Sequence, residues 1–313
     1  MIGTPAPAAK PSLALRILRF PATLLVVELV GFSLVFGLLE APVTTLFGFS
    51  PFGFFVFVVI GSILLVLAWK AVRRWVEGER DREFTLPGAG RELGAGLLAG
   101  FLLFSLVTVL VAMLGGIEFV GIRPFGKTQF WEWAAIAVAS GMFEETISRG
   151  IMLRQLEQLV GTGWALAATS ALFGALHMFN PDATWIGAIS IMVEAGILLG
   201  ACYLYTRRLW LAAGLHGAWN FTQAWIFSVP VSGTGQSIGI LVTRRNGPLW
   251  LTGGDFGLEA SMVAVVVGTI AGVFLLWKAY RRHGFVAPMW SRKRLDEAVR
   301  VDVDADSHAL GEG

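Results

Sequence analysis

Long apolar runs separated by short polar or charged segments dominate the chain. Several of these runs reach the roughly 20 residues that a helix needs to cross the hydrocarbon core of a membrane. Gly and Pro stand at many of their ends and mark the turns between them. The pattern predicts an all-α fold, a polytopic transmembrane helix bundle of about eight spans with a core of four helices. The predicted spans are residues 20–41, 52–72, 93–114, 131–150, 163–179, 185–206, 209–229 and 258–280.

The basic residues give these spans an orientation. With the N-terminus in the cytoplasm, 20 of the 24 Lys and Arg residues fall on the cytoplasmic side of the predicted spans. Cytoplasmic loops of membrane proteins carry just such an excess of positive charge. We therefore expect a multi-pass integral membrane protein of a prokaryotic cell membrane, with both termini in the cytoplasm. The four basic residues left outside are Arg123, Lys127, Arg244 and Arg245.

The composition supports the membrane class and excludes others. The chain is 55% hydrophobic and only 15% charged, whereas a soluble domain carries about 25% charged residues. The single cysteine, Cys202, excludes an intramolecular disulfide framework. The basic residues lie at membrane ends without interleaved stacking aromatics, so we expect membrane lipids and no nucleic acid as partners.

Two adjacent carboxylates and an arginine lie inside the fourth predicted span. A charged side chain at the bilayer centre costs about 2.5–3.5 kcal/mol on insertion scales, so such groups usually serve a function. On a helix, Glu145 and Arg149 are separated by one turn and can form an ion pair. Glu144 points about 100° away from them and is left for other chemistry.

Two histidines and an asparagine occupy other predicted spans. Phe173 and His177 share one helical face, and His216 and Asn220 share another. Each group alone could serve only to hydrogen-bond neighbouring helices together. For the pair of Glu145 and Arg149 we favour that structural role. The whole set favours chemistry, because polar groups in a membrane must face a common interior or a wet cavity.

The types of residue present narrow that chemistry. No Gly-x-Ser-Gly, no aspartate pair and no His-Glu-x-x-His stands in any predicted span. What remains is a glutamate that can deprotonate water, a histidine beside it, and a His/Asn pair that can donate to an oxyanion. These parts predict hydrolysis of a peptide bond at or within the membrane.

The same residues in this order resemble the CPBP family of intramembrane proteases. That family includes CAAX prenyl endopeptidases as well as bacteriocin-processing and self-immunity proteins. The resemblance covers about residues 131–227, with residues 1–130 before it and 228–313 after it as separate parts of the chain. Its three motifs here are Glu144-Glu145-x-x-x-Arg149, Phe173-x-x-x-His177 and His216-x-x-x-Asn220.

The resemblance implies a glutamate-dependent endopeptidase that acts on a peptide or protein substrate, such as a C-terminal CAAX-like peptide. In the family, the residues at Glu144 and His177 activate water, and those at His216 and Asn220 hold the oxyanion. Glu145, Arg149 and Phe173 would then be supporting residues. Many members are labelled metalloproteases, and zinc could be held by three ligands here. We favour a metal-free site, since the asparagine suits hydrogen bonding better; the zinc ligands would be Glu144, His177 and His216.

A second hypothesis from another class is a non-proteolytic scaffold or immunity protein that binds a peptide in the same cavity. A transporter is a third, weakened by the lack of a paired inverted repeat. Two further intramembrane carboxylates, Glu28 and Glu194, have no motif. For Glu194, lining a cavity and bonding to a neighbouring helix are equally supported. The protease hypothesis requires Glu144 and His177 to lie at the same depth, although their predicted spans place them at different depths.

Overall fold

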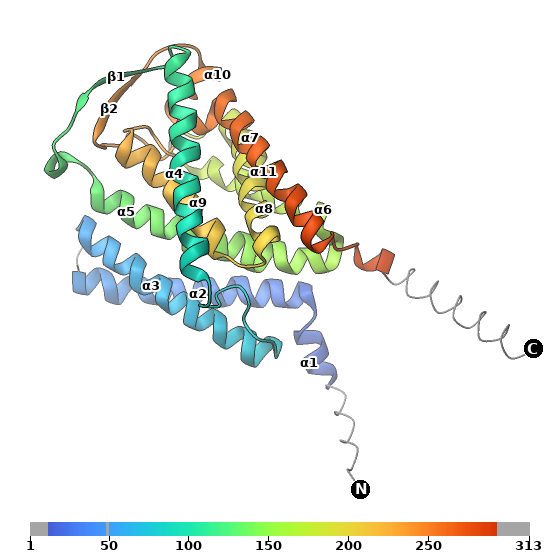
Figure 1. The fold of residues 1–313 in the computed structure, drawn as a ribbon. Coiled ribbons are helices and arrows are strands. Elements are labelled where there is room, and N and C mark those ends of the chain that lie inside the picture. The colour runs from blue at the N-terminus through green and yellow to red at the C-terminus, as the bar shows by residue number, and fades with distance from the viewer. Residues whose placement is uncertain (1–11, 48–49, 293–313) are drawn as a thin grey trace, which may run out of the picture.

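The chain folds into a bundle of helices with one small antiparallel sheet (Figure 1). A computed structural model describes residues 12–47 and 50–292. The tail after Arg300 therefore lies outside the described residues. The α-helices are α1 (Leu13–Leu18), α2 (Pro21–Phe47), α3 (Pro51–Ala71), α4 (Ala89–Met113), α5 (Phe130–Ala139), α6 (Arg154–Leu176), α7 (Trp185–Ile191), α8 (Ile197–Thr206), α9 (Trp210–Phe221), α10 (Leu249–Thr252) and α11 (Met262–His283).

Several helices contain π-helical turns, in which the backbone bonds reach one residue further than in an α-helix. These turns join neighbouring α-helices into longer continuous runs: α5 to α6, α7 to α8, and α3 and α9 to the segments that follow them. The π-helical segments are η1 (Val72–Glu77), η3 (Ser140–Glu144), η4 (Thr146–Leu153), η6 (Met192–Gly196) and η7 (Thr222–Ile226). Short 3₁₀ turns are η2 (Phe125–Lys127), η5 (His177–Phe179), η8 (Gly254–Phe256) and η9 (Leu258–Ala260).

Five of the described helical runs are long and apolar enough to cross a membrane. This finding agrees with the multi-pass membrane class. The predicted number of eight spans stays a prediction: one run holds two of the predicted spans, and neither the first nor the seventh predicted span is among the five. The five runs are Pro51–Glu77, Ala89–Met113, Phe130–Phe179, Trp185–Thr206 and Met262–His283.

The longest run bends sharply at Gly161, whose φ of 81° lies in the left-handed region that favours glycine. The sequence predicted a helix end at residue 150, and this boundary was wrong: the helix continues to the residue before Gly161. The charges of Arg154 and Glu157 made this stretch look like a loop. In the folded chain both side chains are buried and paired, Arg154 with Glu28 and Glu157 with Arg207.

The bend at Gly161 bears on the question of depth. Glu144 lies 17 residues before Gly161 and His177 lies 16 residues after it. At the α-helical rise of 1.5 Å per residue, these arms would span about 25 Å and about 24 Å, and the π-helical η4 makes the first arm somewhat shorter. Two helical arms of nearly equal length that leave one bend can bring Glu144 and His177 to the same level.

Several segments that the distribution of Lys and Arg assigned to one side of the membrane lie together at one end of the bundle. The guanidinium of Arg19 donates to the carbonyl of Val76 at 3.1 Å, and Arg208 pairs with Glu92 at 3.0 Å. Near the same end, the amide of Thr162 donates to the carbonyl of Val286 at 3.0 Å. The alternating course of the helices thus follows the predicted pattern, while the side of the membrane on which this end lies stays a prediction.

The opposite end contains structure that the hydrophobic pattern did not predict. β1 (Ile117–Ile122) and β2 (Leu241–Arg245) pair antiparallel and connect two segments far apart in the sequence (Figure 1). Residues 230–257 are rich in Gly, Ser and Thr, and they include β2 and α10. The strands are short and mostly exposed, so no long alternating run marks them in the sequence.

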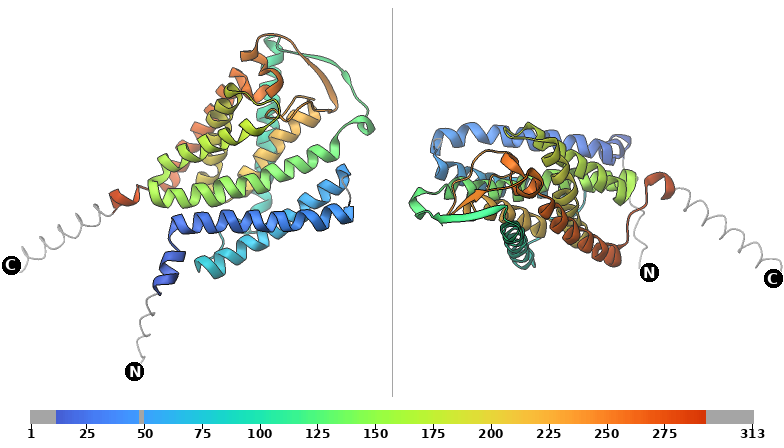
Figure 2. Two further views of the ribbon diagram at one scale, coloured as in Figure 1. Left: turned by 180° about the vertical axis from the view of Figure 1, so that it is seen from behind. Right: turned by 90° about the horizontal axis from the view of Figure 1, so that it is seen from above.

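α2 and α3 form a layer against the α5–α6 run, as the views from behind and above show (Figure 2). Buried charges hold this layer. Arg154 of α6 donates to both carboxylate oxygens of Glu28 at 2.8 and 3.0 Å, and its other terminal nitrogen pairs with Glu77 at 2.7 Å. Glu28, one of the two carboxylates without a motif, therefore has a structural partner.

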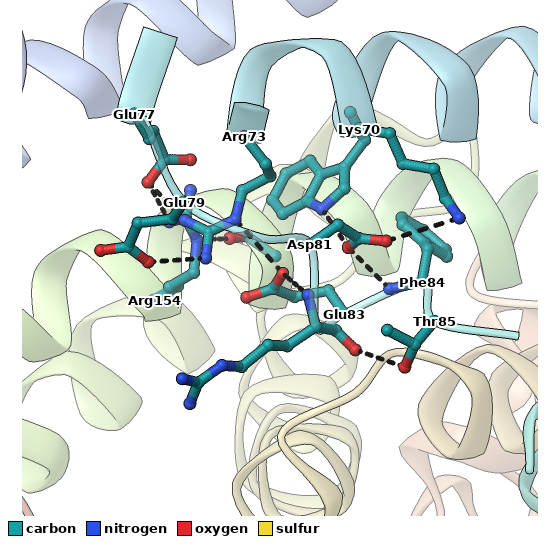
Figure 3. Close-up of polar contacts among 12 residues, drawn as sticks. Lys70, Arg73, Glu77, Glu79, Asp81, Glu83, Phe84, Thr85 and Arg154 are labelled. Atoms are coloured by element: carbon teal, nitrogen blue, oxygen red, sulfur yellow. Dashed lines mark hydrogen bonds and ion pairs between the residues drawn. The ribbon is translucent and has the colours of Figure 1, made fainter. Parts of the chain in front are cut away.

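The segment after α3 folds back onto this pair as a network of charges (Figure 3). Arg73 contacts three carboxylates, those of Glu77, Glu79 and Glu83, at 2.5, 3.0 and 3.5 Å. Residues 73–83 thus form an ordered cluster of charges that packs against α6.

Close backbone approach fixes α9 against α5. A Cβ added to Gly217 would lie 2.6 Å from the carbonyl oxygen of Ala137, and one added to Gly141 would lie 2.4 Å from that of Ala213. Real Cβ contacts are longer than this, so both positions require glycine for steric reasons. Small residues let membrane helices approach closely in the same way.

Replacing Arg154 with Ala should destabilise the fold strongly. The change leaves Glu28 and Glu77 as buried charges without their shared partner, which costs about 3–5 kcal/mol. The measurement is thermal or denaturant unfolding of the purified protein in detergent. Lys70→Ala is the matched control, because its 3.7 Å pair with Asp81 is 38% exposed on the lysine side and should contribute about 0–1 kcal/mol. Equal unfolding midpoints for the two variants would contradict the assignment.

Replacing Gly217 with Ala should push α9 away from α5. Forcing a methyl group into this contact should cost about 1–3 kcal/mol of stability. Gly163→Ala is the control, since a Cβ at Gly163 meets open space and alanine favours the helix by up to about 1 kcal/mol. Unfolding of both variants under the same conditions measures the difference. A Gly217→Ala protein as stable as Gly163→Ala would show that the two helices can separate freely.

Candidate active site

A buried glutamate joins the first and third motifs. Glu145 is fully buried, and its Oε1 accepts hydrogen bonds from Nη1 of Arg149 at 2.9 Å and from Nδ1 of His216 at 2.8 Å. The predicted one-turn pair with Arg149 is therefore confirmed by the structure. The bond to His216 was not predicted, and it anchors α9 to the π-helical segment that carries both glutamates.

Phe173 lies at the centre of the three motifs. The guanidinium of Arg149 lies over its ring at 4.4 Å from the centroid. The ring also meets His177 edge-on at 4.9 Å and His216 at 5.8 Å between centroids. A cation and two imidazoles thus pack on one aromatic ring, whose electron-rich face and positive edge favour these contacts.

His177 has a defined tautomer. Its Nδ1 lies 2.7 Å from the backbone carbonyl oxygen of Phe173. A carbonyl oxygen only accepts, so Nδ1 carries the proton and donates. In the neutral ring, Nε2 is then the acceptor and is left for a ligand or a water molecule.

Glu144 and its neighbour Glu145 have opposite environments. The side chain of Glu144 is 45% exposed, whereas that of Glu145 is 0% exposed. Oε2 of Glu144 lies 4.0 Å from Nε2 of His216, which is longer than a hydrogen bond. The carboxylate of Glu144 and the ring of His216 are therefore not hydrogen-bonded to each other. Glu144 remains accessible to water.

Asn220 lies one helical turn beyond His216 and is buried at 6% exposure. Within residues 12–47 and 50–292, no side-chain hydrogen bond ties up its amide. The amide lines the same cavity as His216. It is therefore free to donate to a group that enters the cavity.

The four proposed catalytic side chains line one cavity of about 310 Å³. Glu144 comes from η3, His177 from the end of α6, and His216 and Asn220 from α9. The sequence predicted this convergence of separate helices from the motifs. The structure brings the four groups to one cavity.

Part of the cavity wall comes from residues that the sequence did not single out. The remaining polar lining residues are Ser148, Asn180, Ser232 and Thr234. Nδ2 of Asn180 donates to the carbonyl of Ser232 at 2.6 Å and so joins the end of α6 to the segment after α9. Asn180 lies three residues after His177, so its position next to that motif could have identified it from the sequence. Ser232 lies in a loop without any motif.

The three alternative zinc ligands are not assembled into a metal site in the observed arrangement. Among the described residues, no three His, Cys, Asp or Glu side chains are placed to hold one metal ion. The Nδ1 atoms of His177 and His216 are engaged by the carbonyl of Phe173 and the carboxylate of Glu145, which leaves Nε2 of each ring for a ligand. We therefore derive no step through a metal from Glu144, His177 and His216.

Comparison with known proteins places the motifs in a family. Residues 126–222 match the family of type II CAAX prenyl endopeptidase Rce1-like proteins. No curated protein and no solved structure matches the chain. The matched segment contains all three motifs, from Glu144 to Asn220. The predicted resemblance is thus confirmed: this segment of the chain is similar to the Rce1-like type II CAAX prenyl endopeptidases.

Proposed function

We propose that the chain is an intramembrane endopeptidase that hydrolyses peptide bonds with a glutamate as the general base. One observation carries the proposal: four polar side chains from three helices line one cavity inside a membrane bundle. Two buried contacts of Glu145, to Arg149 and His216, hold that geometry in place. The family match over residues 126–222 supports the same class of reaction.

Water activation falls to Glu144 and His177. The accessible carboxylate of Glu144 takes one proton from a water molecule, and Nε2 of His177 accepts a hydrogen bond from the same water. The oxygen of this water then attacks the carbonyl carbon of the scissile peptide bond, and the C=O π electrons move onto oxygen.

His216 and Asn220 stabilise the resulting oxyanion. The amide of Asn220 donates directly, and His216 donates through Nε2 when both of its ring nitrogens carry protons. Glu145 accepts from Nδ1 of that ring and compensates its positive charge. When the intermediate collapses, the C–N bond breaks and Glu144 returns its proton to the leaving nitrogen. One water molecule is consumed, and a carboxylic acid and an amine are formed.

For the substrate we propose a C-terminal CAAX-like or small peptide that reaches the cavity from the membrane. Several apolar residues line the cavity alongside the polar groups, namely Ile136, Ile147, Leu176 and Val231. These side chains suit aliphatic positions of a peptide. The family description supports the CAAX class.

Glu144→Gln should abolish cleavage while keeping the shape of the side chain. Loss of the general base should lower the rate by about 10²–10⁴-fold. The measurement is hydrolysis of a farnesylated CAAX peptide by the purified protein in lipid vesicles. Glu118→Gln is the control, since this carboxylate is 55% exposed on β1, away from the cavity lining, and its loss should leave the rate unchanged.

Cleavage that survives Glu144→Gln would disprove the role of this residue. If the unmodified protein does not cut the CAAX peptide, crosslinking the Glu144→Gln protein to bound peptides in cells identifies the substrate to use instead. If the protein protects cells against a peptide without cleaving it, and Glu144→Gln and His177→Ala keep that protection, the scaffold or immunity hypothesis would be supported.

Chelation should leave the activity unchanged, because the observed side chains do not form a metal site. The test is cleavage after dialysis against a strong zinc chelator, with metal analysis of the same sample. A known zinc protease treated in parallel is the control. Stoichiometric zinc in the purified protein, with activity lost on chelation and restored by zinc, would overturn the metal-free mechanism.

A further inference from the structure

A second, much smaller cavity lies next to the candidate active site. Its volume is about 20 Å³, which is room for about one water molecule. It shares Phe173, His177, His216, Asn220 and Ser232 with the larger cavity. These shared residues therefore form the partition between the two.

Two buried glutamates line this small cavity but not the larger one. Glu194 of η6 is 2% exposed and Glu259 of η9 is 3% exposed. Oε2 of Glu259 accepts from the backbone amide of Ser232 at 2.5 Å and from its hydroxyl at 2.9 Å. Oε2 of Glu194 has no hydrogen-bond partner in the part of the chain that the structure describes.

Neither carboxylate has a cationic partner of the kind that stabilises Glu145. In the described ranges, no Lys or Arg forms an ion pair with Glu194 or Glu259. Burial raises the pKa of the Glu259 carboxyl, although its hydrogen bonds from Ser232 and the nearby His177 oppose the shift. Two carboxylates that face one small, buried cavity cannot both ionise without strong repulsion.

Close packing restricts Glu194 on one side. Gly268 of α11 backs Glu194 so closely that an added Cβ would lie 2.9 Å from Oε2. The two donors from Ser232 stabilise a negative charge on Glu259. The available proton therefore belongs on Glu194, the carboxyl that lacks donors.

We propose that Glu194 and Glu259 share one proton across a single buried water molecule, and that this pair positions the wall of the active-site cavity. The shared proton does not depend on the proposed peptidase function. Only the role of the cavity wall in catalysis rests on that function. Glu259 reaches the wall through Ser232, which has a φ of 48°, unusual for a residue other than glycine. Such strain persists only when the surroundings hold it, as at many functional sites. The same Ser232 lines the active-site cavity beside His177 and Asn220.

The pair should lose its proton at high pH, and the second negative charge should then displace Ser232. The titratable groups that face the pair are His177 at the end of α6 and His216 on α9. Arg149 approaches from η4, where it donates to the carbonyl of Ala195 at 3.4 Å. The full-length protein should therefore lose activity at alkaline pH more steeply than a variant that cannot form the second charge.

Glu194→Gln is that variant, because a neutral amide replaces the protonated carboxyl at equal size. Infrared spectroscopy of the purified full-length protein measures the proton directly, through the carbonyl stretch of a protonated carboxyl. We expect this band at neutral pH and its loss in Glu194→Gln. Glu157→Gln is the matched control: Glu157 is also buried, but it pairs with Arg207 and accepts from Thr162 as a carboxylate, so the band should remain. A band unchanged by Glu194→Gln would overturn the shared proton.

Unfolding gives a second readout that does not depend on activity. A proton that the pair holds in the folded protein and releases on unfolding stabilises the fold most at low pH, and this stability is lost as pH rises until the folded pair also loses the proton. The unfolding temperature should therefore fall as pH rises, and less so in Glu194→Gln. If Glu194→Gln does not fold, the pH dependence of the unmodified protein decides the question: a flat profile would contradict the proposal.

Cleavage tests the positioning role. Glu194→Gln should keep its kcat/KM at neutral pH and hold it to higher pH than the unmodified protein. Glu259→Ala, which releases Ser232, should lose up to about 100-fold, the scale of a small misplacement of reacting groups. If infrared and unfolding results hold but no peptide is cleaved, only the proposed function fails. If Glu144 is essential and the spectra show no shared proton, only this inference fails.

Discussion

The buried carboxylate of Glu145 is the constraint on which the site depends. It accepts one donor from its own helix, Arg149, and one from α9, His216, and all three side chains are almost fully buried. A buried charge is tolerated only while its partners stay in place, so the two helices cannot slide past each other cheaply. Through Arg149 the same cluster holds Phe173, and through Phe173 it orders both imidazoles. Glu144, one position earlier, stays outside the cluster and open to the cavity.

The local parts of this arrangement could be predicted from the sequence. Residues four apart on a helix share a face, so the motif spacings placed Glu145 with Arg149, Phe173 with His177, and His216 with Asn220. The apolar runs and the shortage of charge gave the helical membrane class. These inferences hold because they depend on neighbours in the sequence, where helical geometry alone decides.

The rest depends on partners that no local pattern reveals. The stretch around Arg154 and Glu157 is polar enough to look like a loop, and only the buried pairs with Glu28 and Arg207 make it helical. The same holds for Ser232, whose place in the cavity wall is set by distant residues. The two-stranded sheet likewise joins segments more than a hundred residues apart, and its strands are too short to show a period.

The bend at Gly161 has a consequence for how this chain can vary. Both helical arms are measured from that point, and each residue of an α-helix advances about 1.5 Å and rotates about 100°. Inserting or deleting one residue within either arm would turn Glu144 or His177 away from the cavity, even though hydrophobicity and motif composition were unchanged. Related sequences should therefore tolerate length differences in the connections outside these two arms. Within each arm, the number of residues between the bend and Glu144 or His177 should stay the same.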